Sequence, residues 1–169
     1  TLRHTLFPYT TLFRSSNIVK KANQDLFTSN QHQFFLTLFL GILNLRKGEL
    51  NYCNAAHTIP YILKTDGKII ELNQSHGLPL GLYPEKQYQE SRIKLEPGDK
   101  IILYTDGVNE LLDENQEYFG MKRFKDNLRH LTGLSPEDMV KRMEKSLEVY
   151  RGEAAQTDDI CIFVLAFKP

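Results

Sequence analysis

Three turn signals in succession, with no helical segment between them, constrain the fold of this chain more than any other feature. Strand-like apolar segments flank Arg46-Lys47-Gly48, Thr65-Asp66-Gly67 and Glu96-Pro97-Gly98-Asp99. Gly, Asp and Pro are the residues that tight turns require. Parallel strands would instead need long crossover connections, usually helices. The pattern therefore predicts three β-hairpins and antiparallel sheets.

Three amphipathic helices are expected around these strands. Ser16 is a cap for the first helix, and Ser135-Pro136-Glu137-Asp138 is a capping box that starts the last one. Their apolar faces are Val19, Ala22 and Leu26, then Met121, Phe124, Leu128 and Leu131, then Val140, Met143, Leu147 and Tyr150. The apolar run Ile160–Phe167 predicts a final strand, central and buried. Strands, helices and a returning strand indicate the α+β class.

Composition excludes several classes of function. The 169 residues suffice for one domain, and 21 basic residues balance 21 acidic ones, so no nucleic-acid partner is expected. The longest apolar run, Phe34–Leu45, is too short to span a bilayer, so no membrane contact is expected. Cys53 and Cys161 lie in apolar strands and are interpreted as buried free thiols, which suits a cytoplasmic protein.

The first fifteen residues differ from the rest. Thr-Leu-Phe occurs twice, at Thr5–Phe7 and Thr11–Phe13, and no acidic residue precedes Asp25. We interpret residues 1–15 as a non-native or disordered leader, with a genuine edge strand as the alternative. Residues 16–169 are then the domain itself.

Two acidic motifs stand at the ends of predicted strands. Asp106-Gly107 directly follows the apolar strand Ile101–Tyr104, and Asp158-Asp159 directly precedes the last strand. A carboxylate beside a buried strand is costly unless it is hydrogen-bonded or bound to metal. Carboxylates gathered from separate strands are ligands that suit Mg²⁺ or Mn²⁺, which can activate water and neutralise phosphoryl charge. Taken alone, Asp106-Gly107 is more typical of an ordinary turn at the end of a strand, and Asp158-Asp159 is compatible with a loop.

His57 is the one histidine at a strand junction. It follows a strand and precedes Pro60, which favours an extended entry into the next strand. A catalytic base is one interpretation of this position. A hydrogen-bonded structural histidine is the interpretation that the pattern favours.

The order and spacing of six motifs resemble the SpoIIE-type branch of the PPM-type phosphatases. They are Phe35–Gly41, Gly48–Ala55, Leu78–Gly81, Pro97–Asp99, Leu103–Val108 and Asp158–Ile160. The resemblance implies an αββα sandwich of two antiparallel sheets flanked by helices. It also implies a protein serine/threonine phosphatase that uses two Mn²⁺ or Mg²⁺ ions. The substrate it implies is a phosphorylated regulatory partner of the anti-anti-sigma type.

Carried over by position, Asp106 and Asp158 resemble the metal ligands of this family, and Asp159 is the less favoured ligand. Gly107 and His57 would support the site. The family also has an N-terminal Gly-Asp motif that bridges the metals, and this sequence lacks it. The domain is therefore expected to be N-terminally truncated, without an assigned catalytic residue and inactive as a fragment. The family pattern further has Gly where this chain has Ala56, which is tolerable if the backbone there avoids positive φ.

Two other functions compete with the enzyme. The first is a non-catalytic, phosphatase-like module that binds a phosphorylated partner in a signalling pathway. The second is a cupin-like sugar-binding barrel, suggested by the Pro97–Asp99 turn and His57. A cupin requires paired histidine ligands, which the sequence lacks, and it leaves the two C-terminal helices unexplained.

Overall fold

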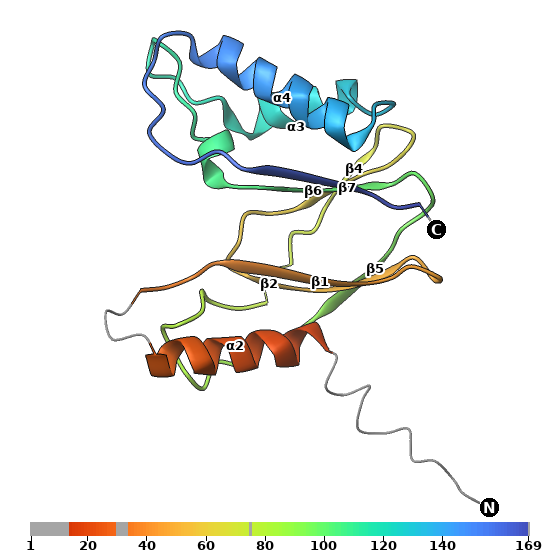
Figure 1. The fold of residues 1–169 in the computed structure, drawn as a ribbon, viewed down its shortest axis with the longest axis vertical. Helices are drawn as coiled ribbons and strands as arrows, with labels where there is room; N and C mark the ends of the chain where they lie inside the picture. Colours follow the sequence, from red (N-terminus) through yellow and green to blue (C-terminus); the bar gives the residue numbers. More distant parts are fainter. Residues whose placement is uncertain (1–13, 30–33, 75, 169) are drawn as a thin grey trace, which may run out of the picture. The chain divides into compact units, whose positions relative to one another are not determined.

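The computed structural model describes residues 14–29, 34–74 and 76–168, which form two compact units (Figure 1). The first unit comprises Thr1–His57 and Gln74–Leu95, and the second comprises Thr58–Asn73 and Glu96–Pro169. The chain therefore passes between the units three times. The acidic motifs both belong to the second unit, whereas His57 ends a segment of the first.

The first unit is a three-stranded antiparallel sheet with a helix along it. The helix α2 covers Ser15–Ser29, and the strands β1 (Leu38–Asn44), β2 (Glu49–Ala55) and β5 (Ser91–Lys94) are ordered β1-β2-β5. Figure 1 shows α2 running along this sheet. The predicted apolar face of α2 is confirmed, because Val19 is buried against Cys53 and Ala55, and Ala22 and Leu26 pack beside it.

Helix α2 begins one residue before the predicted cap. Ser15 is fully buried, and both its backbone N–H and its hydroxyl donate to the Glu90 carboxylate at 3.1 Å. The last residue assigned to the leader therefore packs within the first unit. Residues 1–13 lie outside the described part of the chain, so for them the leader stays a prediction.

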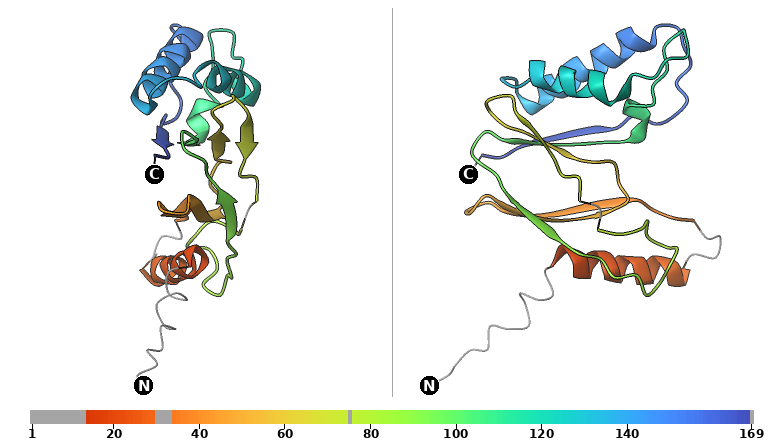
Figure 2. Two further views of the ribbon diagram at one scale, coloured as in Figure 1. Left: turned by 90° about the vertical axis from the view of Figure 1, so that its right-hand side faces the viewer. Right: turned by 180° about the vertical axis from the view of Figure 1, so that it is seen from behind.

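The second unit is a four-stranded antiparallel sheet with two helices on one face (Figure 2). Its strands β3 (Tyr61–Leu63), β4 (Ile69–Glu71), β6 (Lys100–Tyr104) and β7 (Ile162–Ala166) are ordered β4-β3-β6-β7. A 3-10 turn, η1, covers Asp106–Val108, and the helices are α3 (Gly120–His130) and α4 (Pro136–Arg151). The buried helix residues Phe124, Leu128, Met139, Met143 and Leu147 pack against the sheet.

The predicted start of α4 is confirmed. Ser135 is the N-cap in extended conformation, its hydroxyl accepts from the Asp138 N–H at 3.1 Å, and Pro136 is the first helical residue. The buried stripe differs from the prediction at both ends: Met139 is buried in place of Val140, and Val140 and Tyr150 are only half-buried.

The first two predicted hairpins are confirmed, and the third is wrong. β1 pairs with β2, β3 pairs with β4, and Gly48 and Gly67 adopt the positive φ of their turns. β5 and β6 do not pair with each other: β5 pairs with β2 in one sheet, and β6 pairs with β3 and β7 in the other. The Glu96–Asp99 turn thus carries the chain from one sheet to the next.

The last strand lies at an edge and not in the centre. β7 pairs with β6 alone among the described strands, and Phe163 and Leu165 are 50% and 39% exposed. Cys161, predicted to be buried, is exposed, whereas Cys53 is buried as predicted. Packing against the helices explains why the strand is apolar. It does not determine whether the other face is buried or whether a further strand pairs with the outer edge.

The predicted α+β class, with two antiparallel sheets and accompanying helices, is confirmed. Among the helices of the described residues, none has the length and apolar character that crossing a bilayer requires.

Candidate functional site

Asp106 stands where β6 ends. Thr105 is still extended, and Asp106 opens η1, so the strand changes direction at the carboxylate. The Asp106 backbone carbonyl accepts from the Glu110 N–H at 2.9 Å, which closes the turn behind it. Its side chain is exposed. The turn therefore presents the carboxylate to solvent from a fixed backbone.

Gly107 brings the two acidic motifs together. A Cβ atom at this position would lie 2.5 Å from the Asp159 carbonyl oxygen and 3.0 Å from its carbonyl carbon. Real Cβ atoms do not approach that closely, so only glycine allows the backbone of the Asp106-Gly107 turn to lie against Asp158-Asp159. The sequence predicted neighbouring strands at this point, and β6 and β7 are adjacent, with Tyr104 opposite Ile162.

Thr105 is a residue of the candidate site that the sequence reasoning missed. Its hydroxyl donates to the Asp159 carbonyl at 2.8 Å and accepts from the Cys161 N–H at 2.9 Å. Its own N–H donates to the Cys161 carbonyl at 3.0 Å. Thr105 thus fastens the start of β7 to the end of β6. The sequence feature that could have identified Thr105 is its position as a hydroxyl residue between an apolar strand and an acidic turn.

Asp158 and Asp159 are both exposed and play different local roles. The Asp158 carboxylate accepts from the Asp159 N–H at 2.7 Å, and the Asp158 carbonyl accepts from the Gln156 side chain at 2.8 Å. The Asp159 carbonyl is held by Thr105, as above. Within the described part of the chain, no Lys, Arg or His forms an ion pair with Asp106, Asp158 or Asp159. Three carboxylates without a protein counter-cation are left at one end of the sheet.

His57 lies in the other unit, in a turn closed by Asn54. The Asn54 side chain accepts from the His57 N–H at 2.8 Å and donates to the His57 carbonyl at 3.2 Å. Ala56, between them, has a φ of +60°. The family's Gly position is thus occupied here by an alanine in the left-handed region, so the condition under which alanine was expected to be tolerated is not met.

The described residues form only part of a metal site. Nowhere in residues 14–29, 34–74 and 76–168 do three or more His, Cys, Asp or Glu side chains converge in a way that could hold a metal ion. Oxygen ligands of Mg²⁺ and Mn²⁺ fit the chemistry of Asp106, Asp158 and Asp159. Their number and arrangement do not complete a coordination shell.

The model of the family "Stage II sporulation protein E (SpoIIE)" matches residues 6–168. The chain belongs to the SpoIIE family. Over 113 residues, 66% of the chain and 18% of the relative, it is 33% identical to Protein IcfG of Synechocystis. Over 101 residues, 59% of the chain and 30% of the relative, it is 31% identical to Phosphoserine phosphatase RsbU of Bacillus subtilis. The chain thus spans less than a third of these two curated relatives.

Solved structures share the fold of this SpoIIE-family chain. The SiaA-PP2C domain of Pseudomonas aeruginosa superposes with a TM-score of 0.80 at 24% identity, over 92% of this chain and 61% of that one. The manganese-presoaked phosphatase domain of SpoIIE from Bacillus subtilis gives a TM-score of 0.65 at 20% identity, over 89% and 64% of the two chains. The predicted resemblance to the SpoIIE branch is confirmed.

Proposed function

We propose that the protein to which this chain belongs is a metal-dependent phosphatase that hydrolyses phosphoserine or phosphothreonine on another protein. The observation that carries the proposal is the close packing of the Asp106-Gly107 backbone against the backbone of Asp158-Asp159. The carboxylates of these segments are exposed and form no ion pair within the described part of the chain. Membership of the SpoIIE family supports the same chemistry.

The metal ligands in this proposal are Asp106 and Asp158, with Asp159 as the weaker candidate. Mn²⁺ and Mg²⁺ both suit carboxylate oxygens, and a complete site would hold two ions. The described residues supply a partial set of donors, so further ligands must come from residues beyond those described. Gly107 and Thr105 are positioning residues, because they hold the Asp106-Gly107 turn against Asp158-Asp159. His57 supports its own turn through Asn54.

The substrate in this proposal is a phosphorylated regulatory protein of the anti-anti-sigma type, in the cytoplasm. A relative named as a phosphoserine phosphatase supports the phosphorylated residue. The balance of basic and acidic residues supports a protein partner over nucleic acid.

A non-catalytic binding module is the second candidate, because such a module needs no complete set of metal ligands. Such a module would recognise a phosphorylated partner without hydrolysing it. Both candidates predict binding of the phosphorylated protein, but only the enzyme predicts its hydrolysis. The same set of variants therefore distinguishes the two candidates.

The experiment compares hydrolysis of a phosphoserine protein by the full-length parent protein with Mn²⁺, in wild type and in Asp106→Asn. The enzyme proposal expects Mn²⁺-dependent turnover that Asp106→Asn abolishes, while the surface control Asp25→Asn keeps it. Binding of the phosphoprotein without turnover would support the module and refute the enzyme. The 169-residue chain alone is expected to turn over no faster than its own Asp106→Asn variant, because its donor set is partial.

A further inference from the structure

The charges of this chain are balanced overall but are divided unevenly between its two units. The first unit contains nine Lys and Arg against four Asp and Glu, a net charge of +5, and the second contains twelve against seventeen, a net charge of −5. Every Asp and Glu of the chain lies in the described part, and Arg3 is the only Lys or Arg outside it. Without Arg3 the first unit keeps a charge of +4, so its positive excess belongs to the residues that the structure describes.

Four cations of the first unit gather at the turn between β1 and β2. Arg46 and Lys47 lie in the turn itself. Arg92 and Lys94 of β5 lie next to it, because β5 pairs with β2 in a register that places Lys94 opposite Glu49. All four side chains are exposed, and we call these four residues the basic hairpin end. Glu49 is the only acidic residue in the three strands of this sheet and the turn.

Hydrogen bonds fix the backbone of the basic hairpin end. The Asn44 side chain accepts from the Lys47 N–H at 3.1 Å, and the Lys94 ammonium donates to the Lys47 carbonyl. The Arg92 Nε donates to the Asn51 side chain at 2.8 Å. That bond leaves both Nη groups of Arg92 without a hydrogen bond among the described residues, and a guanidinium presents these groups as a fork that matches a carboxylate. The surface is therefore ordered before any partner binds.

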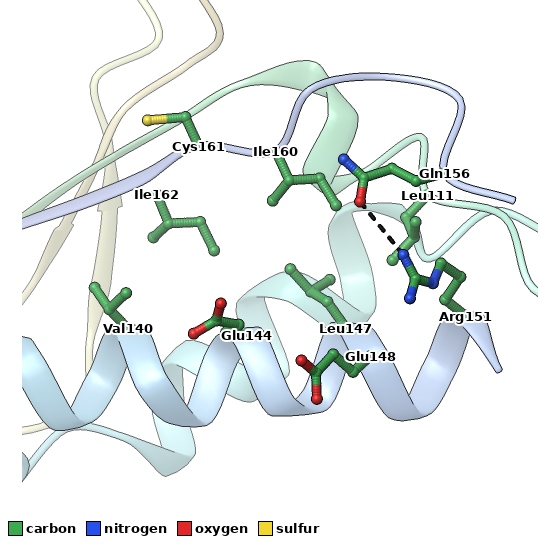
Figure 3. A pocket seen from close by; sticks show the side chains of 10 residues that line it. All are labelled: Leu111, Val140, Glu144, Leu147, Glu148, Arg151, Gln156, Ile160, Cys161 and Ile162. Atoms are coloured by element: carbon green, nitrogen blue, oxygen red, sulfur yellow. Dashed lines mark hydrogen bonds between the residues drawn. The ribbon is translucent and has the colours of Figure 1, made fainter.

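Cations of the second unit lie among acidic residues, and those of the basic hairpin end do not. Arg151 of the second unit lines a cavity of about 450 Å³ together with Glu144 and Glu148, and it donates to the Gln156 side chain at 3.4 Å (Figure 3). Charges of both signs therefore face that cavity. In contrast, none of the ion pairs found in the described part of the chain involves a member of the basic hairpin end.

We propose that the basic hairpin end binds an acidic surface of the phosphorylated protein on which the proposed phosphatase acts. This inference rests on the proposed function and adds to it a docking surface that contains none of the candidate metal ligands. Within the first unit, the turn precedes β2 and His57 follows it, so the seven residues of that strand separate them by roughly 23 Å. The surface is therefore expected to contact a part of the partner other than its phosphorylated residue.

The pattern of charges favours a protein as the partner. Arg92 and Lys94 stand two positions apart on one face of β5, about 7 Å from each other, which suits carboxylates spread over a surface better than one phosphate ion. Glu49 lies opposite Lys94. A lipid surface of uniform negative charge would repel Glu49, whereas a protein can place a basic or polar group there. Leu45, which is 62% exposed beside Arg46, adds apolar area to such an interface.

The first experiment measures binding of the phosphoserine protein to the full-length parent protein by isothermal titration calorimetry in EDTA, so that no hydrolysis occurs. Arg46→Glu with Lys47→Glu should raise the dissociation constant about tenfold, because each substitution replaces attraction by repulsion. Neither side chain forms a hydrogen bond or an ion pair among the described residues, so the fold should not change. The matched control is Lys122→Glu with Lys145→Glu, an equal change in charge at side chains that are 93% and 73% exposed, and it should bind like wild type.

The second experiment separates docking from chemistry by steady-state kinetics with Mn²⁺. The double variant Arg46→Glu with Lys47→Glu should raise KM for the phosphoserine protein about tenfold and leave kcat within about twofold. Its hydrolysis of p-nitrophenyl phosphate, which is too small to reach the basic hairpin end from the site, should equal that of wild type. Added salt should weaken phosphoprotein binding more in wild type than in the double variant, because fewer attractive charges remain to be screened.

Failure of the proposed function and failure of the docking surface give different results. Wild type that binds the phosphoserine protein without hydrolysing it would refute the phosphatase, and weaker binding by the double variant would still support the docking surface. Wild type that does not bind, or a double variant that binds as tightly as wild type, would overturn the docking surface. It would also be overturned if the double variant lost sedimentation with phosphatidylserine vesicles but kept protein binding, because that result would assign the surface to a membrane.

Discussion

The two ends of β6 carry carboxylates in opposite circumstances. Asp99, before the strand, has no solvent exposure, and its carboxylate binds the Lys64 ammonium at 2.6 Å and the Glu96 N–H at 2.7 Å. Asp106, after the strand, is exposed and has no ion-pair partner in the described part of the chain. The chain neutralises the first carboxylate with its own Lys64, although the buried Oδ1 of Asp99 has no hydrogen-bond partner among the described residues. It leaves the second carboxylate without a cation. Burial with a cationic partner makes Asp99 a structural acid, whereas exposure without such a partner leaves Asp106 available for the metal site that we propose.

The largest expected effect is at the buried end. Asp99→Asn removes the charge that compensates Lys64, which is only 17% exposed, and should cost about 3 kcal/mol of unfolding free energy. Burial alone would lower the pKa of Lys64, but its hydrogen bonds to Asp99 and Glu96 raise it. Urea denaturation measures the loss. The control Glu96→Gln, at a partner with 70% exposure, should cost less than about 1 kcal/mol. Equal losses for both variants would remove the distinction between buried and exposed acids.

The next largest effect is at Gly107. Gly107→Ala forces a methyl group against the Asp159 carbonyl, so the unfolding free energy should fall by about 2 kcal/mol as the two segments separate. Gly133→Ala is the matched control, because a Cβ there meets nothing within 4 Å. If Gly107→Ala were as stable as the control, the acidic segments would not be held together by that contact.

A smaller effect of opposite sign is expected at Ala56, in the turn before His57. Ala56→Gly relieves a side chain from the left-handed region and should raise the unfolding free energy by about 0.5–1 kcal/mol, after the entropy cost of glycine is subtracted. Thermal or urea unfolding measures the gain. The control is Ala155→Gly, at an exposed alanine without positive φ, which should not stabilise the chain. A loss of stability at Ala56→Gly would show that the turn is not strained.

The smallest effect is at the exposed end. Asp106→Asn and Asp158→Asn should each change the unfolding free energy by less than about 0.5 kcal/mol, because neither carboxylate has a cationic partner to lose. The same urea titration that is used for Asp99→Asn makes the comparison. A loss at Asp106 as large as at Asp99 would assign it a structural role.

Local signals predicted much of the fold. The capping box at Ser135 and the glycine turns at Gly48 and Gly67 depend on nearby residues, so the sequence contains the whole cause. The Pro97-Gly98-Asp99 turn is also a local signal. The pairing partners of β5 and β6, however, depend on strands that are distant in the sequence. The same limit applies to Ile162–Ala166, whose apolar sequence is compatible with either an edge strand or a central strand of a sheet. Packing of the Asp106-Gly107 turn against Asp158-Asp159 was predictable from strand order. The hydrogen bonds by which Thr105 joins the end of β6 to the start of β7 could be found only from the atomic contacts.

The most direct test of the central claim is Mn²⁺ binding to the 169-residue chain, followed by electron paramagnetic resonance of free Mn²⁺. The claim is that Asp106 and Asp158 act together at one binding point. Wild type should bind Mn²⁺ weakly, with a dissociation constant on the order of 10⁻⁴–10⁻³ M, since few protein ligands surround the ion. Asp106→Asn or Asp158→Asn alone should abolish that binding, and the double variant should lose nothing more. Binding that survives either single substitution, or that the two substitutions reduce independently, would contradict the claim.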